Sequence, residues 1–291
     1  GPYVVKTDGL AAGKGVLVTD DLGEAEADVR DKLAGTAFGD AGRQVIIEEH
    51  LSGPEVSVFA VCDGTRTVCL PPAQDFKRVG DGDSGPNTGG MGAWSPLPFV
   101  EAGFAELVAE QFIEPTLSAL RARGVEYRGV LYAGLMLTSE GPKLLEYNVR
   151  FGDPDSQVVL LRCTSDLAEL LAAAADGDLT TVPAPTFADD AAVLVVAASE
   201  GYPVSPRTGD VIEGVEAARS VEGATLLAAG VGADAGGDLV TAGGRVLNVI
   251  GRGADPAQAR DRAYEAIGHI SWPGMHHRTD IASAGRADGS A

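Results

Sequence analysis

Short apolar runs of strand character dominate the first 70 residues, and they do not alternate strictly with helices. Helical character in this part is confined to residues 22–33. Gly and Asp turns separate the strand-like runs, which cover residues 3–6, 16–18, 44–49, 55–61 and 67–70. Strict alternation would favour a doubly wound parallel sheet, so its absence favours α+β layers with mainly antiparallel sheets.

The middle of the chain repeats this mixture. Residues 101–123 have apolar positions at helical spacing. The runs 130–137 and 143–148 form a predicted hairpin, because the turn sequence Thr-Ser-Glu-Gly-Pro joins them. Two further helices are expected at residues 157–163 and 166–175, the second with Asp166 as its N-cap.

Pro183, Pro185 and the pair Asp189-Asp190 mark a break in the pattern. A chain of 291 residues exceeds one typical domain, and we therefore expect a small separate lobe beyond this break. A helix is expected at residues 256–270, and short strands at 191–198, 225–229, 239–241 and 245–251. The small, polar residues 282–291 are expected to be a disordered tail.

The composition restricts the possible partners and the compartment. A formal net charge of -20 disfavours nucleic acid and anionic membranes, because phosphates would be repelled. No apolar run reaches the roughly 18 residues of a membrane span, and no signal peptide is recognisable. Three cysteines without Cys-x-x-Cys spacing indicate reduced thiols. We expect a soluble, cytoplasmic protein.

A glycine-rich turn, KTDGLAAGKGV, begins at Lys6 and contains Lys14. Glycines let backbone N–H groups approach an anion, and two lysines supply charge suited to a triphosphate. It is not a Walker motif, and the alternative is an ordinary tight turn, which most glycine-rich hairpins are.

Acidic residues interrupt a buried-strand pattern in VIIEEHLSGPEVSV, which runs from Val45 to Val58. Such an interruption offers backbone groups to a flat ring such as adenine, and Glu55 is placed for ribose hydroxyls. A solvated hairpin is the alternative for the same pattern.

The long segment QDFKRVGDGDSGPNTGGMGAWSP, residues 74–96, reads as irregular. Segments of this length inside a compact domain are uncommon unless they are functional or disordered. Charged and polar residues are spaced among its glycines, which suits a loop that closes over a charged ligand. These residues are Asp75, Lys77, Arg78, Asn87 and Thr88. A flexible surface loop is the alternative.

The stretch EYNVRFGDPDSQ, residues 146–157, places polar groups directly after an apolar strand. Alternation along a strand puts Glu146, Asn148 and Arg150 on one face, with Tyr147 and Val149 on the other, packing face. A carboxylate and an amide oxygen suit Mg²⁺ that takes its other ligands from phosphates and water. An edge strand with ordinary surface ion pairs is the alternative.

These stretches together resemble, in order and spacing, the phosphoribosylamine–glycine ligase family, also called glycinamide ribonucleotide synthetase, of the ATP-grasp superfamily. GYPVSPRTGDVI and GGRVLNVIG extend the resemblance, which covers residues 4 to 280. It implies two mainly antiparallel α+β subdomains, at residues 1–62 and 63–188. A small β-rich C-terminal domain at 189–281 and the tail follow them.

The resemblance also implies a reaction and its site residues. ATP, glycine and 5-phosphoribosylamine would give glycinamide ribonucleotide, ADP and phosphate through a glycyl phosphate, in purine biosynthesis. The alternatives are an ATP-binding fragment that does not turn over because the N-terminal lobe is missing, and another ATP-grasp carboxylate-amine ligase. A monomer is expected. Mg²⁺ or Mn²⁺ would bind Glu146 and Asn148, and Lys77, Arg150 and Asp153 would be catalytic. The implied ATP contacts are Lys6, Lys14, Glu48, Glu49, Leu51, Glu55, Arg78 and Asn87.

Three features depart from the family pattern. Asp155 stands where the family usually has Glu, and Phe76 stands where His is expected. The chain starts at Gly1, whereas the family has an N-terminal lobe that helps to bind phosphoribosylamine. We therefore expect much of the ATP and metal site in this chain, and expect turnover to need the N-terminal region.

Overall fold

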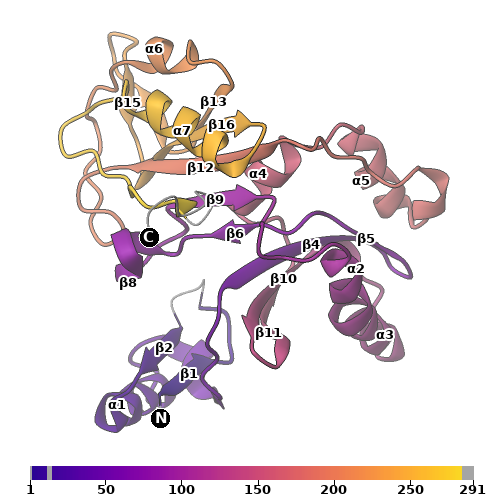
Figure 1. The fold of residues 1–291 in the computed structure, drawn as a ribbon. Helices are drawn as coiled ribbons and strands as arrows, with labels where there is room; N and C mark the ends of the chain where they lie inside the picture. The colour runs from indigo at the N-terminus through magenta and orange to yellow at the C-terminus, as the bar shows by residue number, and fades with distance from the viewer. Residues whose placement is uncertain (1, 12–14, 284–291) are drawn as a thin grey trace. The chain divides into compact units, whose positions relative to one another are not determined.

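The structure is a computed structural model that describes residues 2–11 and 15–283. The chain divides into two compact units. The first comprises Gly1–Pro54 with the hairpin tip Met136–Gly141, and the second comprises Glu55–Leu135 with Pro142–Ala291. Among the described residues, no helix is long and apolar enough to cross a membrane. Figure 1 shows the chain order of the elements.

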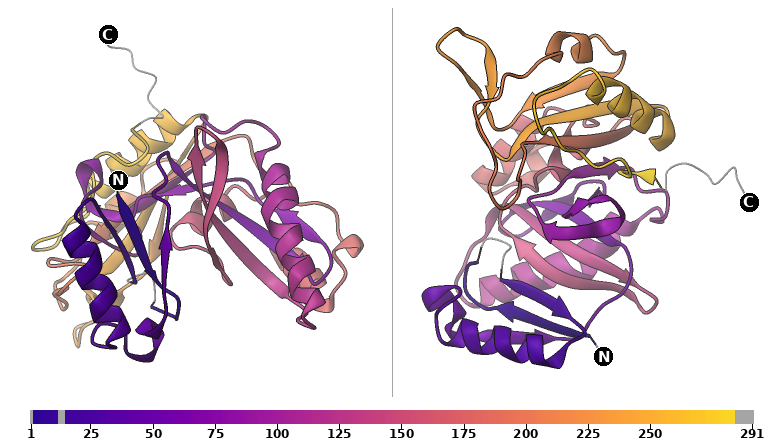
Figure 2. Two further views of the ribbon diagram at one scale, coloured as in Figure 1. Left: turned by 90° about the horizontal axis from the view of Figure 1, so that it is seen from below. Right: turned by 90° about the vertical axis from the view of Figure 1, so that its left-hand side faces the viewer.

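The first unit contains a three-stranded antiparallel sheet of order β2-β1-β3. Its strands are β1 (Tyr3–Thr7), β2 (Val16–Thr19) and β3 (Val45–Glu48). Helix α1 (Leu22–Leu33) lies along this sheet (Figure 2), and the short helix η1 (Gly39–Arg43) precedes β3. Asp21 begins α1, because its carboxylate accepts the N–H of Gly23 at 2.7 Å. The predicted strands and helix are confirmed.

The second unit contains a four-stranded sheet of order β11-β10-β4-β5. Its strands are β4 (Glu55–Asp63), β5 (Thr67–Cys69), β10 (Arg128–Thr138) and β11 (Gly141–Asn148). The helix expected at 101–123 is divided into α2 (Phe104–Val108), a π turn η3 (Ala109–Ile113) and α3 (Glu114–Ala122). Pro115 accounts for the interruption, since it lacks an N–H for the preceding turn.

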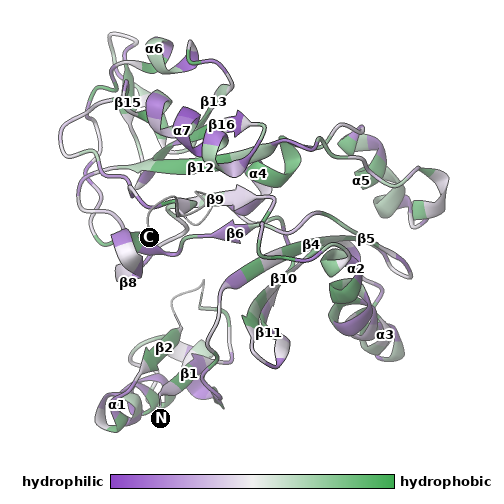
Figure 3. Cartoon of the chain, in the orientation of Figure 1, coloured by the Kyte–Doolittle hydropathy of each residue, from purple (hydrophilic) through white to green (hydrophobic). Residues whose placement is uncertain are grey.

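A five-stranded antiparallel sheet of order β13-β16-β12-β9-β6 forms the other half of this unit. Its central strand β12 (Ala191–Ala198) is buried at every position, and Figure 3 shows its apolar character. Strands buried on both faces read as continuous apolar runs, which explains the sequence AAVLVVAA. The other strands are β6 (Gln74–Asp75), β9 (Gly92–Ser95), β13 (Ala224–Ala228) and β16 (Arg245–Gly253).

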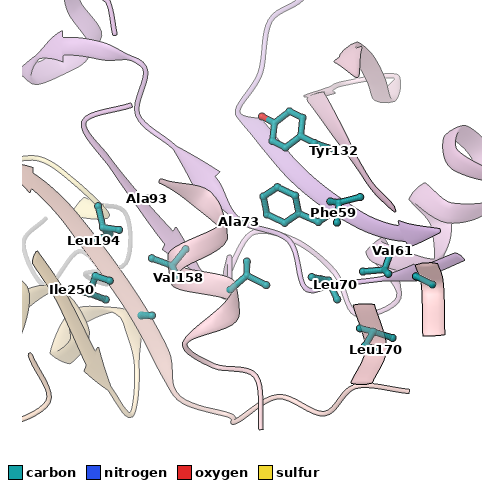
Figure 4. Close-up of a cluster of buried hydrophobic side chains, with 14 of the residues drawn as sticks. Phe59, Val61, Leu70, Ala73, Ala93, Tyr132, Val158, Leu170, Leu194 and Ile250 are labelled. Atoms are coloured by element: carbon teal, nitrogen blue, oxygen red, sulfur yellow. The ribbon is translucent and has the colours of Figure 1, made fainter. Parts of the chain in front are cut away.

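Helices cover both faces of this sheet. Leu194 and Ile250 point to one face and join Val158 of α4 (Asp155–Leu160) in the buried cluster of Figure 4. On the other face, α7 (Pro256–Ile267) packs closely on β16. A Cβ at Gly251 would lie 2.1 Å from the carbonyl oxygen of Ala259, so only glycine permits this approach.

Smaller elements complete the second unit. Asp166 caps α5 (Leu167–Asp176) by accepting the N–H of Ala168 at 2.8 Å, as predicted. The remaining elements are β7 (Arg78–Gly80), η2 (Asp81–Asp83), β8 (Ser84–Asn87), η4 (Leu179–Thr181), α6 (Val215–Arg219), β14 (Val231–Ala233) and β15 (Leu239–Thr241).

The structure changes the interpretation of residues 74–96. The sequence predicts an irregular segment, whereas the structure contains four short strands there, β6 to β9. Strand β9 pairs with β12, so the five-stranded sheet contains residues from both sides of the boundary expected near residue 189. The apolar run of β12 requires a hydrogen-bonded neighbour on each side, and β9 supplies one of them.

Asp63 joins two parts of the second unit. Its carboxylate accepts the N–H groups of Thr65 at 2.8 Å, Arg66 at 2.7 Å and Leu179 at 2.9 Å. Burial opposes its ionisation, but these hydrogen bonds outweigh burial and lower its pKa to about 2.

Asp63→Asn in the full-length protein should therefore lower the free energy of unfolding at pH 7 by about 1–3 kcal/mol. A depressed folded-state pKa gives stability that is present above the unfolded pKa of about 4 and is lost as the pH falls towards 2. Urea titrations at pH 7 and pH 3 should show the difference from wild type shrinking at pH 3. A constant difference would contradict the assignment, and exposed Asp176→Asn is the control.

Candidate functional site

The predicted site residues fall into both units. Lys6, Glu48, Glu49 and Leu51 belong to the first unit, and Glu55 begins the second. The other predicted residues of the second unit are Lys77, Arg78, Asn87, Glu146, Asn148, Arg150 and Asp153. Lys14 lies outside the described residues.

Lys6 lies on the central strand of the first unit's sheet. It stands opposite Val16 on β2 and Ile46 on β3, so the three side chains share one face. Val16 is 40% exposed and Ile46 is 41% exposed. Lys6 Nζ pairs with Glu48 Oε2 at 2.5 Å. This face combines exposed apolar surface with a lysine, which suits a flat ring joined to phosphates.

Glu49 and Leu51 directly follow β3. Glu49 is exposed and Leu51 is half-buried, and neither belongs to a regular element. The interrupted-strand pattern predicted from the sequence is confirmed, since β3 ends at Glu48 and β4 begins at Glu55.

Glu55 and Lys77 form an ion pair in the second unit. Gln74 Nε2 donates to the carbonyl oxygen of Glu55 at 3.1 Å. The carbonyl oxygen of Lys77 accepts two hydrogen bonds from Thr88, one from its N–H at 2.7 Å and one from its hydroxyl at 2.8 Å. Glu55 therefore holds the side chain of Lys77, and Thr88 holds its carbonyl group. The sequence does not predict the pairing of Lys77 with Glu55.

Arg78 and Asn87 stand directly opposite each other in the β7–β8 ladder. Both side chains are exposed, and Arg78 Nη1 donates to the carbonyl oxygen of Gly85 at 2.8 Å. The structure thus brings together a cation and an amide that lie nine residues apart, a combination that suits phosphate oxygens.

Glu146 and Asn148 lie at the end of strand β11. Asn148 Nδ2 donates to Glu146 Oε1 at 3.1 Å, so the two side chains lie on the same face of the strand. Among residues 2–11 and 15–283, no group of three or more His, Cys, Asp or Glu side chains could hold a metal. Two hard oxygen donors nevertheless fit Mg²⁺, which accepts one or two protein groups and takes its other ligands from phosphates and water.

Arg150 requires a correction. Strand β11 ends at Asn148, so the alternation that would place Arg150 beside Glu146 does not reach it. Its Nη1 donates to the carbonyl oxygen of Phe151 at 2.8 Å. Tyr147 packs as predicted, with its hydroxyl donating to the carbonyl oxygen of Phe112 at 2.8 Å, whereas Val149 is 73% exposed and the packing role predicted for it is wrong.

The carboxylate of Asp153 is held at both oxygens. Its Oδ1 accepts from Gln157 Nε2 at 3.0 Å, and its Oδ2 accepts from Arg245 Nη2 at 2.9 Å. Arg245 lies 92 residues along the chain from Asp153, and the sequence does not predict this contact.

A group of buried polar residues lies behind Lys77. Asp155 is 3% exposed, and its Oδ1 has no hydrogen-bond partner within the described parts of the chain. Burial raises its pKa, against a hydrogen bond from Ser57. Ser57 Oγ is 2.9 Å from the hydroxyl of Tyr132, whose ring lies 5.4 Å from that of Phe59 (Figure 4).

The half-buried Asp75 interacts with this group. Burial and, next, the neighbouring Asp155 raise the pKa of Asp75 to about 8, although Lys77 acts in the opposite direction. The sequence predicts no site role for Ser57 or Tyr132. The available signal is weak, because each is one polar side chain inside an apolar strand.

Asp75→Asn should weaken the pH dependence of stability. A carboxyl whose folded-state pKa is raised contributes stability below its unfolded pKa of about 4, and that stability is lost as the pH rises to about 8. The melting temperature of the wild type should therefore fall more between pH 5 and pH 8.5 than that of the variant. Parallel curves for wild type and Asp75→Asn would refute the assignment, and exposed Asp176→Asn should follow the wild type.

The antiparallel sheets and their covering helices define an ATP-grasp fold. A crystal structure of phosphoribosylamine–glycine ligase from Thermotoga maritima matches with a TM-score of 0.81 and 38% identity, over 96% of this chain and 68% of that chain. The biotin carboxylase domain of Hydrogenobacter thermophilus 2-oxoglutarate carboxylase, described in complex with MgADP, matches with a TM-score of 0.67. Its identity of 14%, over 95% of this chain and 59% of that one, shows the fold alone.

Two family models together match most of the chain. The ATP-grasp (A) domain of phosphoribosylglycinamide synthetase matches residues 1–156, and the C domain of the same protein matches residues 192–284. The chain belongs to the phosphoribosylglycinamide synthetase family. A relative from Streptomyces coelicolor, phosphoribosylamine–glycine ligase, is 51% identical over 97% of this chain. The chain spans 66% of that relative's length.

Proposed function

We propose that the full-length protein joins glycine to 5-phosphoribosylamine at the expense of ATP, giving glycinamide ribonucleotide, ADP and phosphate in purine biosynthesis. The observation that carries this proposal is the match of both segments, 1–156 and 192–284, to one synthetase family. The proposal concerns the full-length protein, because this chain spans about two thirds of its relatives.

The first unit supplies contacts to ATP in this proposal. Lys6 meets the α- and β-phosphates, and the exposed apolar side chains Val16 and Ile46 on the same face offer contact to the adenine ring. Glu48 to Leu51 offer backbone groups to adenosine. Lys14 would add charge for the phosphates.

Glu146 and Asn148 hold the metal, Mg²⁺ or Mn²⁺, in this proposal. The bound cation supplies neutralisation of the phosphate charge. Arg78 and Asn87 then face phosphate oxygens from their shared position in the β7–β8 ladder. Glu55 is the first residue of β4, and in this proposal it binds the ribose. It also holds Lys77 through their ion pair.

Activation of glycine requires charge neutralisation, because a carboxylate must approach a triphosphate. Burial lowers the pKa of Lys77, but the nearby Asp75 and the ion-pair partner Glu55 raise it above its usual value, so Lys77 carries the positive charge that this step needs. Arg150 is exposed and offers a guanidinium for the developing acyl phosphate. Asp153 fixes the turn that positions glycine. The amine of phosphoribosylamine then displaces phosphate.

The proposal includes the cellular setting. Cys62, Cys69 and Cys163 are free thiols, which fits a reducing cytoplasm. A net charge of -20 fits small-molecule substrates better than nucleic acid or an anionic membrane. A monomeric state remains part of the same proposal.

Glu146→Gln in the full-length enzyme should lower kcat/KM by roughly 10²-fold, the size of effect expected when one preorganised electrostatic group is removed. The amide keeps the shape of the side chain but loses its charge for the cation. The measurement is ADP formation that depends on both glycine and phosphoribosylamine.

Asp176→Asn is the matched control, since Asp176 is an exposed carboxylate at the end of α5. Equal and mild effects of the two substitutions would remove the metal assignment. Turnover that does not need glycine would reject the ligase proposal, and Mg-ATP binding without turnover would indicate a nucleotide-binding module.

A further inference from the structure

Arg245 connects two segments that carry proposed catalytic residues. It is the first residue of β16, and its guanidinium donates three hydrogen bonds. Nη1 reaches the carbonyl oxygen of Gly89 at 2.7 Å and that of Asp153 at 3.1 Å, and Nη2 reaches Asp153 Oδ2 at 2.9 Å. The side chain is 21% exposed, so these bonds are partly shielded from water.

The two segments also touch each other directly. A Cβ at Gly90 would lie 2.3 Å from Cδ of Pro154, and Gly90 has a φ of +110°. Both the close approach and the backbone conformation require glycine at this position. The hydroxyl of Tyr202 accepts the N–H of Gly89 at 2.9 Å. The C-terminal part of the chain therefore holds Gly89 with two side chains, Tyr202 and Arg245.

The contact continues from Gly89 to Lys77. The N–H of Gly90 donates to Thr88 Oγ1 at 3.0 Å, and that hydroxyl donates to the carbonyl oxygen of Lys77 at 2.8 Å. A continuous set of hydrogen bonds thus joins Lys77, Thr88 and the glycine pair to Arg245 and Asp153. Arg78 and Asn87 are held separately, by their own ladder and by the bond from Arg78 to Gly85.

The geometry requires an arginine. A guanidinium presents several N–H groups in a fixed planar arrangement, whereas an ammonium is a single point of charge. One side chain here binds two carbonyl oxygens and a carboxylate on two different segments. A lysine would keep the positive charge but would lose the fixed planar arrangement of N–H donors.

We propose that Arg245, supported by Tyr202, is a positioning residue for the glycine-binding end of the site. It acts through Asp153 and the Gly89-Gly90 pair, and it holds Lys77 and the Asp153 turn at a fixed separation. This inference rests on the proposed ligase function. The ATP contacts assigned to the first unit do not involve Arg245, whose hydrogen bonds to Gly89 and Asp153 lie within the second unit.

Kinetics of the full-length enzyme with Arg245→Gln test the inference. A small displacement of positioned groups can lower a rate by about 10²-fold, so kcat/KM for glycine should fall by roughly that factor. KM for ATP should stay within about twofold, because those contacts are independent. Arg245→Lys should recover part of the loss. Arg219→Gln is the control, since Arg219 pairs with Glu216 at 2.9 Å on the exposed helix α6.

A double variant tests whether Arg245 acts through Asp153. If it does, Arg245→Gln in an Asp153→Asn background should cost far less than in the wild type. A purely structural role would instead lower the melting temperature without a selective change for glycine, and that result would overturn the inference. Additive losses would also overturn it.

The failure of this inference can be told apart from the failure of the proposed function. Wild-type turnover without glycine would overturn both. Glycine-dependent turnover that Arg245→Gln leaves unaffected would overturn the inference alone.

Discussion

The pairing of β12 with a strand on each side determines much of the second unit. Every side chain of β12 is buried, so its backbone groups have no access to water and must bond to neighbouring strands. The neighbours are β9, which ends the glycine-rich segment, and β16, which begins with Arg245. This one constraint places residues 92–95 and 245–253 in the same sheet, and it brings Arg245 at the start of β16 close to Gly89, which shortly precedes β9.

The metal-ligand pair depends on a second constraint, the alternation of β11. Tyr147 directs its ring to the helical layer and bonds to Phe112, so Glu146 and Asn148 necessarily face the other way. The packing of Tyr147 therefore determines the face of the strand on which Glu146 and Asn148 lie. At Val149 the strand has ended, and neither the packing nor the orientation continues.

Local patterns in the sequence predict many elements well. Helix α1 and strand β12 have the predicted bounds, and Asp166 caps α5 as expected, because each depends on periodicity or on neighbouring residues. Residues 74–96 are harder to predict, since β6 and β9 are short and are stabilised by distant strands. The contacts of Arg245 and the burial of Asp155 are set by tertiary structure, and no local pattern specifies them.

The position of β9 beside β12 has a consequence for how the chain can be divided. The family models match two sequence segments with a gap between them, as if each were an independent module. A cut in the gap would leave β9 and β12 each with an unpaired edge that is complementary to the other, and exposed edges of this kind seek a partner strand. We therefore expect the two pieces to behave as the halves of a split protein, and not as two modules that can be exchanged separately between enzymes.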